Sequence, residues 1–306
     1  MRIIFMGSAA LAIPSLKAIC DCGEDEVVGV VSQPDRPAGR KRLLTPCPLK
    51  AFTQERGLAV MTPEKVGDPE SVAALAALKP DLFVVVAYGQ YIPSKIIQLA
   101  PKEAINVHPS LLPTYRGSAP IQWALLNGDQ VTGVSIIYLA PKMDAGDILR
   151  QETYPVDPHD TSVSLHDKLA EFGAALLLKA IDDIRFDRVT RTAQNEEDVV
   201  EVRKLTKEDG QIDWTLPAET LRNRIRAFNP WPGSFCQLPD GSALKVWAAH
   251  LENEAGAPGE LLDDALLVAT GEGALRLTEV QPVGKGRMTA AAFLNGRPLI
   301  AGQMLL

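Results

Sequence analysis

The sequence is poor in cysteine and in histidine. It holds only four of each among its 306 residues. So few cysteines, irregularly spaced, do not build the disulfide framework of a secreted protein. Cys20 and Cys22 lie one residue apart, which is not a usual zinc spacing, and no pair of histidines accompanies them. We therefore expect reduced thiols and no metal.

Long hydrophobic runs are missing as well. No apolar stretch approaches the roughly 20 residues that a bilayer-spanning helix needs. The apolar start at Ile3–Met6 is soon interrupted by Gly7, Ser8 and Pro14, which is unlike a secretion signal and typical of a buried strand followed by a turn. A cytoplasmic protein is the expectation.

An excess of positive charge is the third thing that the chain lacks. The formal net charge is −7, so a nucleic-acid partner would have to bind a local basic patch. Hydrophobic residues make up 46% and charged residues 23%, which is typical of a globular protein. A chain of this length exceeds one ordinary hydrophobic core, which favours two domains of unequal size.

Short β-branched runs alternate with helical stretches over the first two thirds of the chain. Predicted strands are 3–6, 27–31, 82–87, 104–107 and 134–139, and predicted helices are 14–19, 49–56, 70–78, 120–127 and 162–184. Several strands are apolar at consecutive positions, which indicates burial on both faces, as in a parallel sheet covered by helices. The pattern predicts a Rossmann-like α/β domain.

The last third has a different pattern. Residues 185–210 are polar and read as a linker, and a short helix is predicted over 218–228. From 235 to 306, short strands alternate with glycine-rich turn signals, which favours a small OB-like β-barrel. The predicted limits are 1–189 for the α/β domain, 190–208 for the linker and 209–306 for the C-terminal domain.

A carboxamide and an imidazole stand together at the end of one predicted strand. Residues two apart on a strand face the same side, so Asn106 and His108 project together near the carboxyl end, where open α/β sheets bind ligands. Such a pair can donate hydrogen bonds to an oxyanion. Taken alone, an asparagine in a turn and a satisfied buried histidine are the commoner explanation.

Two acids follow in a glycine-containing loop between predicted strands. Acids in such loops are most often solvated turn residues. If Asp144 reaches His108, it would orient the ring, favour its protonated form and accept a proton directly or through water. The pairing is a hypothesis at this point, because a sequence gives no distance.

These residues carry a family resemblance. The run Asn106–Pro120, with Asp144 in a Met-Asp-Ala-Gly-Asp setting, resembles the signature of 10-formyltetrahydrofolate-dependent formyltransferases. The resemblance implies 10-formyltetrahydrofolate as co-substrate, no metal, and catalysis by Asn106, His108 and Asp144. It implies folate contacts from Ser110, Leu111, Leu112, Pro113, Tyr88, Gly89 and Gln90. These motifs leave the acceptor open, with purine-pathway and sugar-amine members among the alternatives.

Three further segments indicate which molecule accepts the formyl group. Residues 32–42, residues 81–90 with 122–124, and residues 226–233 resemble the members of this family that formylate methionine on initiator tRNA. The resemblance implies tRNA contacts from Arg36, Arg40, Lys41 and Arg42. Proline and glycine are expected to keep this basic loop out of regular structure, so that it can follow a phosphate backbone. A solvated charged loop would be the ordinary explanation without the catalytic motif.

The C-terminal part adds less positive charge than the family usually has there. Residues 205–306 contain nine basic and twelve acidic residues, so any tRNA-binding surface must be local. Candidates are Arg222 and Arg226, with Arg224, Lys245, Lys285 and Arg287. A sugar-amine formyltransferase, disfavoured by the basic loop, and a binding module without catalysis, disfavoured by the complete catalytic set, remain the rivals. A monomer is expected.

Overall fold

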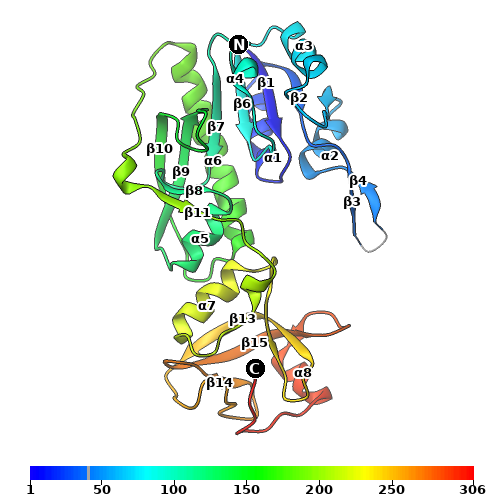
Figure 1. Ribbon diagram of the computed structural model, residues 1–306, viewed down its shortest axis with the longest axis vertical. Helices are drawn as coiled ribbons and strands as arrows, with labels where there is room; N and C mark the ends of the chain where they lie inside the picture. Colours follow the sequence, from blue (N-terminus) through cyan, green and yellow to red (C-terminus); the bar gives the residue numbers. More distant parts are fainter. Residues whose placement is uncertain (40–41) are drawn as a thin grey trace. The chain divides into compact units, whose positions relative to one another are not determined.

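The computed structural model describes residues 1–39 and 42–306, which divide into two compact units (Figure 1). The first consists of Met1–Gly117, Val131–Pro155 and His166–Glu201. The second consists of Ser118–Gln130, Val156–Leu165 and Val202–Leu306.

A seven-stranded sheet forms the centre of the first unit. Its order is β10 (Ile148–Pro155), β9 (Val131–Tyr138), β7 (Ala104–His108), β6 (Leu82–Val86), β1 (Arg2–Gly7), β2 (Glu26–Val31) and β5 (Val60–Met61). The five strands from β7 to β5 pair in parallel, whereas β9 and β10 are antiparallel. The mostly parallel sheet predicted from continuous apolar runs is therefore confirmed.

Helices cover both faces of this sheet. They are α1 (Ala12–Cys22), α2 (Pro48–Glu55), α3 (Pro69–Ala77), α4 (Ser94–Ile97) and α6 (Ser162–Arg185), the last beginning in the second unit. Phe83 and Ala104 pack with Leu75 of α3 and Ile96 of α4. On the opposite face, a methyl group added at Gly173 of α6 would lie 3.1 Å from Val107. Glycine at this position therefore lets α6 approach the sheet closely.

The basic loop is not irregular. Its ends form a two-stranded antiparallel ribbon, β3 (Arg36–Ala38) and β4 (Leu43–Thr45), which projects from the sheet in Figure 1. The expectation that proline and glycine exclude regular structure here was wrong. A ribbon at the edge tolerates Pro37, and Gly39 (φ 68°) and Arg42 (φ 51°) take the left-handed conformations that a tight reversal needs. Arg40 and Lys41 lie outside the described residues.

The sequence indicated a strand after the Asp144 loop without giving its bounds, and the structure has β10 there. Its residues are half-buried or exposed, because β10 is at the edge of the sheet; β9 pairs with it along its length, and Thr192 bridges its first residue, Ile148. The apolar continuity that reveals central strands is therefore missing from it. Two further short strands, β8 (Thr114–Gly117) and β11 (Val200–Val202), form a separate pair.

The second unit is strand-rich and antiparallel, as the turn signals predicted. Its elements are α5 (Pro120–Leu126), α7 (Ala218–Ala227), β12 (Ser234–Gln237), β13 (Ala243–Glu252), β14 (Leu267–Ala269), β15 (Ala274–Pro282), β16 (Met288–Thr289) and α8 (Ala290–Gly296). Leu221 of α7, Leu244, Leu275 and Phe293 share one buried cluster. The unpredicted helix α8 begins at Thr289, whose hydroxyl accepts a hydrogen bond from the amide of Ala292 at 3.2 Å.

Among residues 1–39 and 42–306, no helix is both long enough and apolar enough to cross a bilayer.

We expect the buried sheet to dominate the stability of the first unit. Phe83 has no exposed surface, so Phe83→Ala should lower the free energy of unfolding by about 3–5 kcal/mol. Val131 is 51% exposed, and Val131→Ala should change it by less than about 0.5 kcal/mol. Urea denaturation followed by circular dichroism measures both. Equal losses from the two variants would contradict this account of the core.

Candidate functional site

Strand β7 places Asn106 and His108 on one face of the sheet. Asn106 is opposite Val85 of β6 and Ile137 of β9, and His108 is opposite Ser135. The residue between them, Val107, faces α6 on the other side. The alternation expected of a strand therefore brings the carboxamide and the imidazole to the same face.

The His108 ring is buried and held by a hydrogen bond at one nitrogen, Nε2. It is 5% exposed, and Nε2 lies 3.0 Å from the carbonyl oxygen of Tyr115. A carbonyl can only accept, so Nε2 carries the hydrogen and donates it. Nδ1 then faces Asp144, whose Oδ1 lies 3.7 Å away. This separation exceeds a direct hydrogen bond, and it leaves Nδ1 as the nitrogen available for chemistry.

Burial decides the charge of this ring. It lowers the pKa of the His108 imidazole below the usual 6.5, although the Asp144 carboxylate and the Tyr115 carbonyl act in the opposite direction. Asp144 thus favours the protonated form, as expected, but burial outweighs it. Removing the imidazolium from water costs more than the carboxylate at 3.7 Å returns, so His108 is neutral at neutral pH.

Asp144 is held by the backbone of its loop and by β8. Its Oδ2 accepts a hydrogen bond from the amide of Gly117 at 2.9 Å, and its own backbone is left-handed, with φ 53°. Gly146 lies against β9, where an added methyl group would come within 1.8 Å of the Tyr138 carbonyl oxygen. Only glycine permits this close approach, which turns the loop toward His108.

The Asn106 carboxamide is available for a ligand. Its side chain is half-buried and has no hydrogen-bond partner among residues 1–39 and 42–306. A primary amide carries two donors and one acceptor, and leaving them unpaired in a partly buried place is unfavourable. The arrangement therefore offers a free donor beside a neutral imidazole with a free nitrogen, and a carboxylate behind that nitrogen.

The turn that follows β7 is tied to neighbouring strands. Ser135 accepts a hydrogen bond from the amide of Leu112 at 3.1 Å and donates one to the carbonyl of Ser110 at 2.7 Å. The bond between Leu112 and Pro113 is cis. Leu112 is 3% exposed and belongs to the interior, whereas Leu111 is half-buried and keeps accessible apolar surface. Leu111 is thus the better candidate for a ligand contact.

The segment after β6 is the second predicted folate contact. Gln90 accepts from the amide of Val66 at 2.9 Å and donates to the carbonyl of Pro63 at 3.1 Å, so its side chain is already occupied. Tyr88 is buried, which raises the pKa of its hydroxyl to about 12, and its carbonyl accepts from Ser8 at 2.9 Å. Gly89, with φ 84°, leaves open backbone at this turn.

The predicted tRNA contacts have different surroundings. Arg36 is exposed and paired with Glu64 at 2.7 Å, and Arg42 is exposed at the ribbon's turn. Arg226 is 9% exposed and donates to the Asn223 side chain at 3.1 Å and to the carbonyl of Asp157 at 3.3 Å. Its guanidinium is therefore engaged in hydrogen bonds within the protein.

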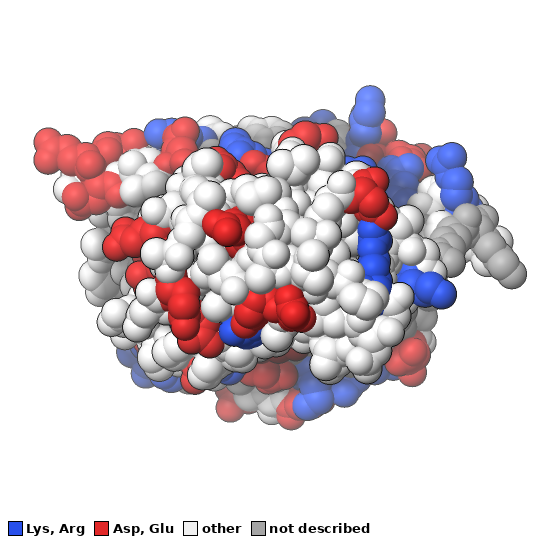
Figure 2. All heavy atoms as spheres, turned by 90° about the horizontal axis from the view of Figure 1, so that it is seen from below, with Lys and Arg blue, Asp and Glu red and all other residues white. Residues whose placement is uncertain are grey.

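A cavity of about 160 Å³ lies beside Arg226. Arg222, Trp247 and His250 also line it. Trp247 carries two cations on its ring, with the Arg287 guanidinium 3.6 Å and the Lys245 ammonium 5.3 Å from the ring centroid. On the face drawn in Figure 2, acidic side chains are scattered and basic ones lie mostly toward the margins, so the coloured residues form no continuous basic surface there.

Sequence reasoning missed a group of polar residues that surrounds the Asp144 loop. Arg116 is 2% exposed, and Gln194 and Glu196 are hydrogen-bonded to it. Arg116 belongs to the run Asn106–Pro120 that carries the family resemblance, but Gln194 and Glu196 lie in the segment that the sequence analysis interpreted as a linker. Nothing in their spacing indicated a partner about 80 positions earlier. Within the described residues, no three His, Cys, Asp or Glu side chains are grouped to hold a metal ion.

Comparison with known proteins gives matches along nearly the whole chain. A family model described as formyl transferase matches residues 1–181, and one described as formyl transferase, C-terminal domain, matches residues 204–298. The methionyl-tRNA formyltransferase of Bacillus licheniformis is 44% identical, with 99% of this chain and 98% of that protein covered. That of Methylococcus capsulatus is 42% identical, with coverage of 100% and 99%.

Solved structures with the same fold are more distant in sequence. WlaRD, a sugar 3N-formyl transferase, superimposes with a TM-score of 0.66 at 20% identity, covering 94% of this chain and 99% of that chain. HypX from Aquifex aeolicus, in complex with tetrahydrofolic acid, superimposes with a TM-score of 0.64 at 21% identity, covering 96% of this chain and 47% of the HypX chain. The chain thus spans about half the length of HypX. At 20–21% identity, the two similarities show a shared fold and nothing more.

The charge state of His108 can be measured directly. We expect the His108 imidazole to titrate below 6.5, because burial favours the neutral ring. In Asp144→Asn the pKa should fall further, since the carboxylate that raises it is gone. Nuclear magnetic resonance of labelled histidine, with His108→Gln to assign the signal, gives both values. A pKa above 6.5, or an upward move in Asp144→Asn, would be incompatible with these surroundings.

Proposed function

The chain belongs to the formyl transferase family, and from this we propose that it transfers the formyl group of 10-formyltetrahydrofolate to the α-amino group of methionine on initiator tRNA. The observation that carries the proposal is the match, over 98–99% of their length, to proteins named methionyl-tRNA formyltransferase. The chain is a transferase that formylates methionyl-tRNA and takes a folate-type co-substrate.

Asn106 is the proposed oxyanion donor. When the unprotonated amine attacks the formyl carbon, a carbon–nitrogen bond forms and negative charge develops on the formyl oxygen. The free Asn106 amide can donate to this oxygen from the face of β7. Its lack of a partner among the described residues supports this role, because a donor already in use would have to break a bond first.

His108 and Asp144 are the proposed proton acceptor and its electrostatic support. Nε2 is committed to the Tyr115 carbonyl, so the amine proton is taken up at Nδ1 of the neutral ring. The imidazolium formed there is stabilised by Asp144 at 3.7 Å and donates to the oxyanion. As the intermediate collapses, the bond from the formyl carbon to the folate nitrogen breaks, and Nδ1 returns the proton to that nitrogen.

Folate contacts are proposed for the two turns beside this pair. Leu111 offers apolar surface to a flat ring, and the open backbone at Gly89 offers polar groups. The hydrogen bonds of Ser110, Leu112 and Gln90 to other parts of the chain support an indirect role for these residues, which is to hold the two turns in place. Pro113 and Tyr88 would act in the same way.

Contacts with tRNA are proposed for the β3–β4 ribbon and for the cations on Trp247. Arg36 and Arg42 belong to the ribbon, Arg40 and Lys41 stand between its strands in the sequence, and Arg222, Lys245 and Arg287 belong to the second unit. Neither Lys245 nor Arg287 is ion-paired with an acid in the part of the chain that the structure describes, so both can pair with phosphates. We propose that the buried Arg226 supports this surface from within.

The remaining assignments follow the same proposal. We assign residues 1–189 to catalysis and 209–306 to tRNA binding, joined by 190–208, and we propose a cytoplasmic monomer that needs no metal. Size-exclusion chromatography with light scattering, at the concentrations used for activity, tests the oligomeric state.

One assay tests the function and the roles of the site together. Incubation with 10-formyltetrahydrofolate and methionyl-tRNA should give formylmethionyl-tRNA, whereas an aminosugar nucleotide should not be formylated. Asn106→Ala should lower the single-turnover rate about a hundred- to a thousand-fold, because one oxyanion donor is lost. His108→Ala should fall in the same range.

The matched control is Asn295→Ala, which removes an exposed carboxamide on α8 and should keep the wild-type rate. Absence of formylmethionine with the wild-type protein would refute the function. A near-normal rate in correctly folded Asn106→Ala would leave the function standing and refute the role of that residue.

Salt dependence tests the proposed tRNA contacts. Arg42→Ala and Arg287→Ala should each weaken tRNA binding and reduce the slope of log affinity against log salt by about 1, since each removes one phosphate contact. Arg276→Ala is the control, because Arg276 is already paired with Asp263 at 2.6 Å. Filter binding at several salt concentrations measures the slope. Slopes identical to that of the wild type would rule these contacts out.

A further inference from the structure

The polar segment that follows α6 lies across the loop that carries Asp144. The carboxamide nitrogen of Gln194 donates one hydrogen bond to the carbonyl of Asp144 and another to the carbonyl of Gly146, each at 2.8 Å. A primary amide has two N–H donors on one nitrogen, and here both are used on the same turn. One side chain thus fixes both ends of the Asp144–Gly146 turn.

Gln194 is itself held in a fixed orientation. Its Oε1 accepts a hydrogen bond from Nε of Arg116 at 2.9 Å. This bond distinguishes the oxygen of the carboxamide from its nitrogen, and it turns the N–H groups toward the loop. Arg116 is 2% exposed, so its guanidinium has little freedom to move.

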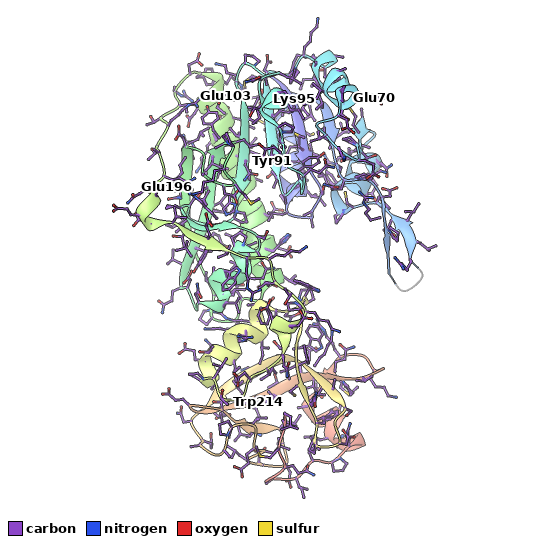
Figure 3. All side chains as sticks on the ribbon, viewed as in Figure 1. Glu70, Tyr91, Lys95, Glu103, Glu196 and Trp214 are labelled. Atoms are coloured by element: carbon purple, nitrogen blue, oxygen red, sulfur yellow. The ribbon has the colours of Figure 1, made fainter. Side chains whose placement is uncertain are left out.

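Glu196, which is labelled in Figure 3, completes the arrangement. One of its oxygens accepts from Arg116 at 2.8 Å, and the other accepts from Lys142 at 3.1 Å. Lys142 lies two residues before Asp144 in the same loop. The segment 194–196 therefore contacts the loop at Lys142, Asp144 and Gly146, which bracket the carboxylate that faces His108.

The loop needs such support because its conformation is unfavourable by itself. The backbone of Asp144 is left-handed, with φ 53°, a region that a residue other than glycine rarely occupies. The carboxylate must nevertheless stay within reach of both the Gly117 amide and the His108 ring. A shift of the Asp144 backbone out of this conformation would re-aim the carboxylate away from both.

We infer that Gln194 is a positioning residue of the formyl transfer, which holds the Asp144–Gly146 turn so that the Asp144 carboxylate faces His108. The inference rests on the proposed function. Gln194 touches neither reacting group and acts through Asp144 alone. The segment that joins the two predicted domains is therefore part of the catalytic apparatus.

Two substitutions separate hydrogen bonding from packing. Gln194→Ala removes the side chain, and Gln194→Glu keeps its size and its acceptor for Arg116 but replaces the two donors by an oxygen. Both should lower the single-turnover rate about ten- to a hundred-fold, the loss expected from a displacement of about 1 Å. The Michaelis constant for tRNA should stay unchanged. Gln98→Ala, at an exposed position, is the matched control.

A double-mutant cycle shows whether the effect passes through Asp144. In an Asp144→Asn background, Gln194→Ala should change the rate by less than about twofold, because the carboxylate that it positions is already absent. A loss of the same factor in both backgrounds would overturn the inference in favour of a general effect on the fold. So would a wild-type rate in Gln194→Glu.

Hydrogen exchange supplies a readout that does not depend on activity. In Gln194→Ala, exchange should become faster in residues 139–148 and at the Gly117 amide, and should stay unchanged in β1 and β6. Unchanged protection of the loop would overturn the inference. If the wild-type protein formylates methionyl-tRNA and Gln194→Ala does so at the same rate, only the inference is refuted. If the wild-type protein is inactive, the proposed function is refuted.

Discussion

The buried hydrogen bond from Nε2 of His108 to the Tyr115 carbonyl determines most of what the site can do. It fixes which ring nitrogen carries hydrogen in the neutral form, and so leaves Nδ1 free on the side of Asp144. Burial then keeps the ring neutral at rest. A neutral imidazole with one committed nitrogen can take up a proton only where the carboxylate stabilises the charge that results.

The rest of the first unit serves this geometry. The parallel sheet delivers Asn106 and His108 to one face, because α6 requires Val107 on the other. The Asp144 loop crosses to that face through Gly146, which tolerates contact with Tyr138 that no larger residue could make. Gln194 and Arg116 then hold the loop from outside. Each support acts on the position of one carboxylate.

Recognition of a large anionic acceptor by a chain of net charge −7 requires basic groups to be concentrated. The ribbon β3–β4 places Arg36 and Arg42 on an extension of the first unit, and Trp247 gathers two more cations in the second. Most other arginines are paired with acids, as Arg150 is with Asp183 and Arg276 with Asp263. The positions of the unpaired cations therefore indicate where an anionic acceptor binds better than their number does.

The sequence by itself determined the parallel sheet, the antiparallel second unit and the pairing of Asn106 with His108, since these depend on local periodicity and on apolar continuity. Only the tertiary structure decided the features that depend on distance and burial. It brought Asp144 to 3.7 Å from the ring, placed Arg226 in the interior, and set Gln194 against the Asp144 loop. Contacts between residues about 30 to 80 positions apart leave no periodic trace in a single sequence, because they arise when separate elements pack.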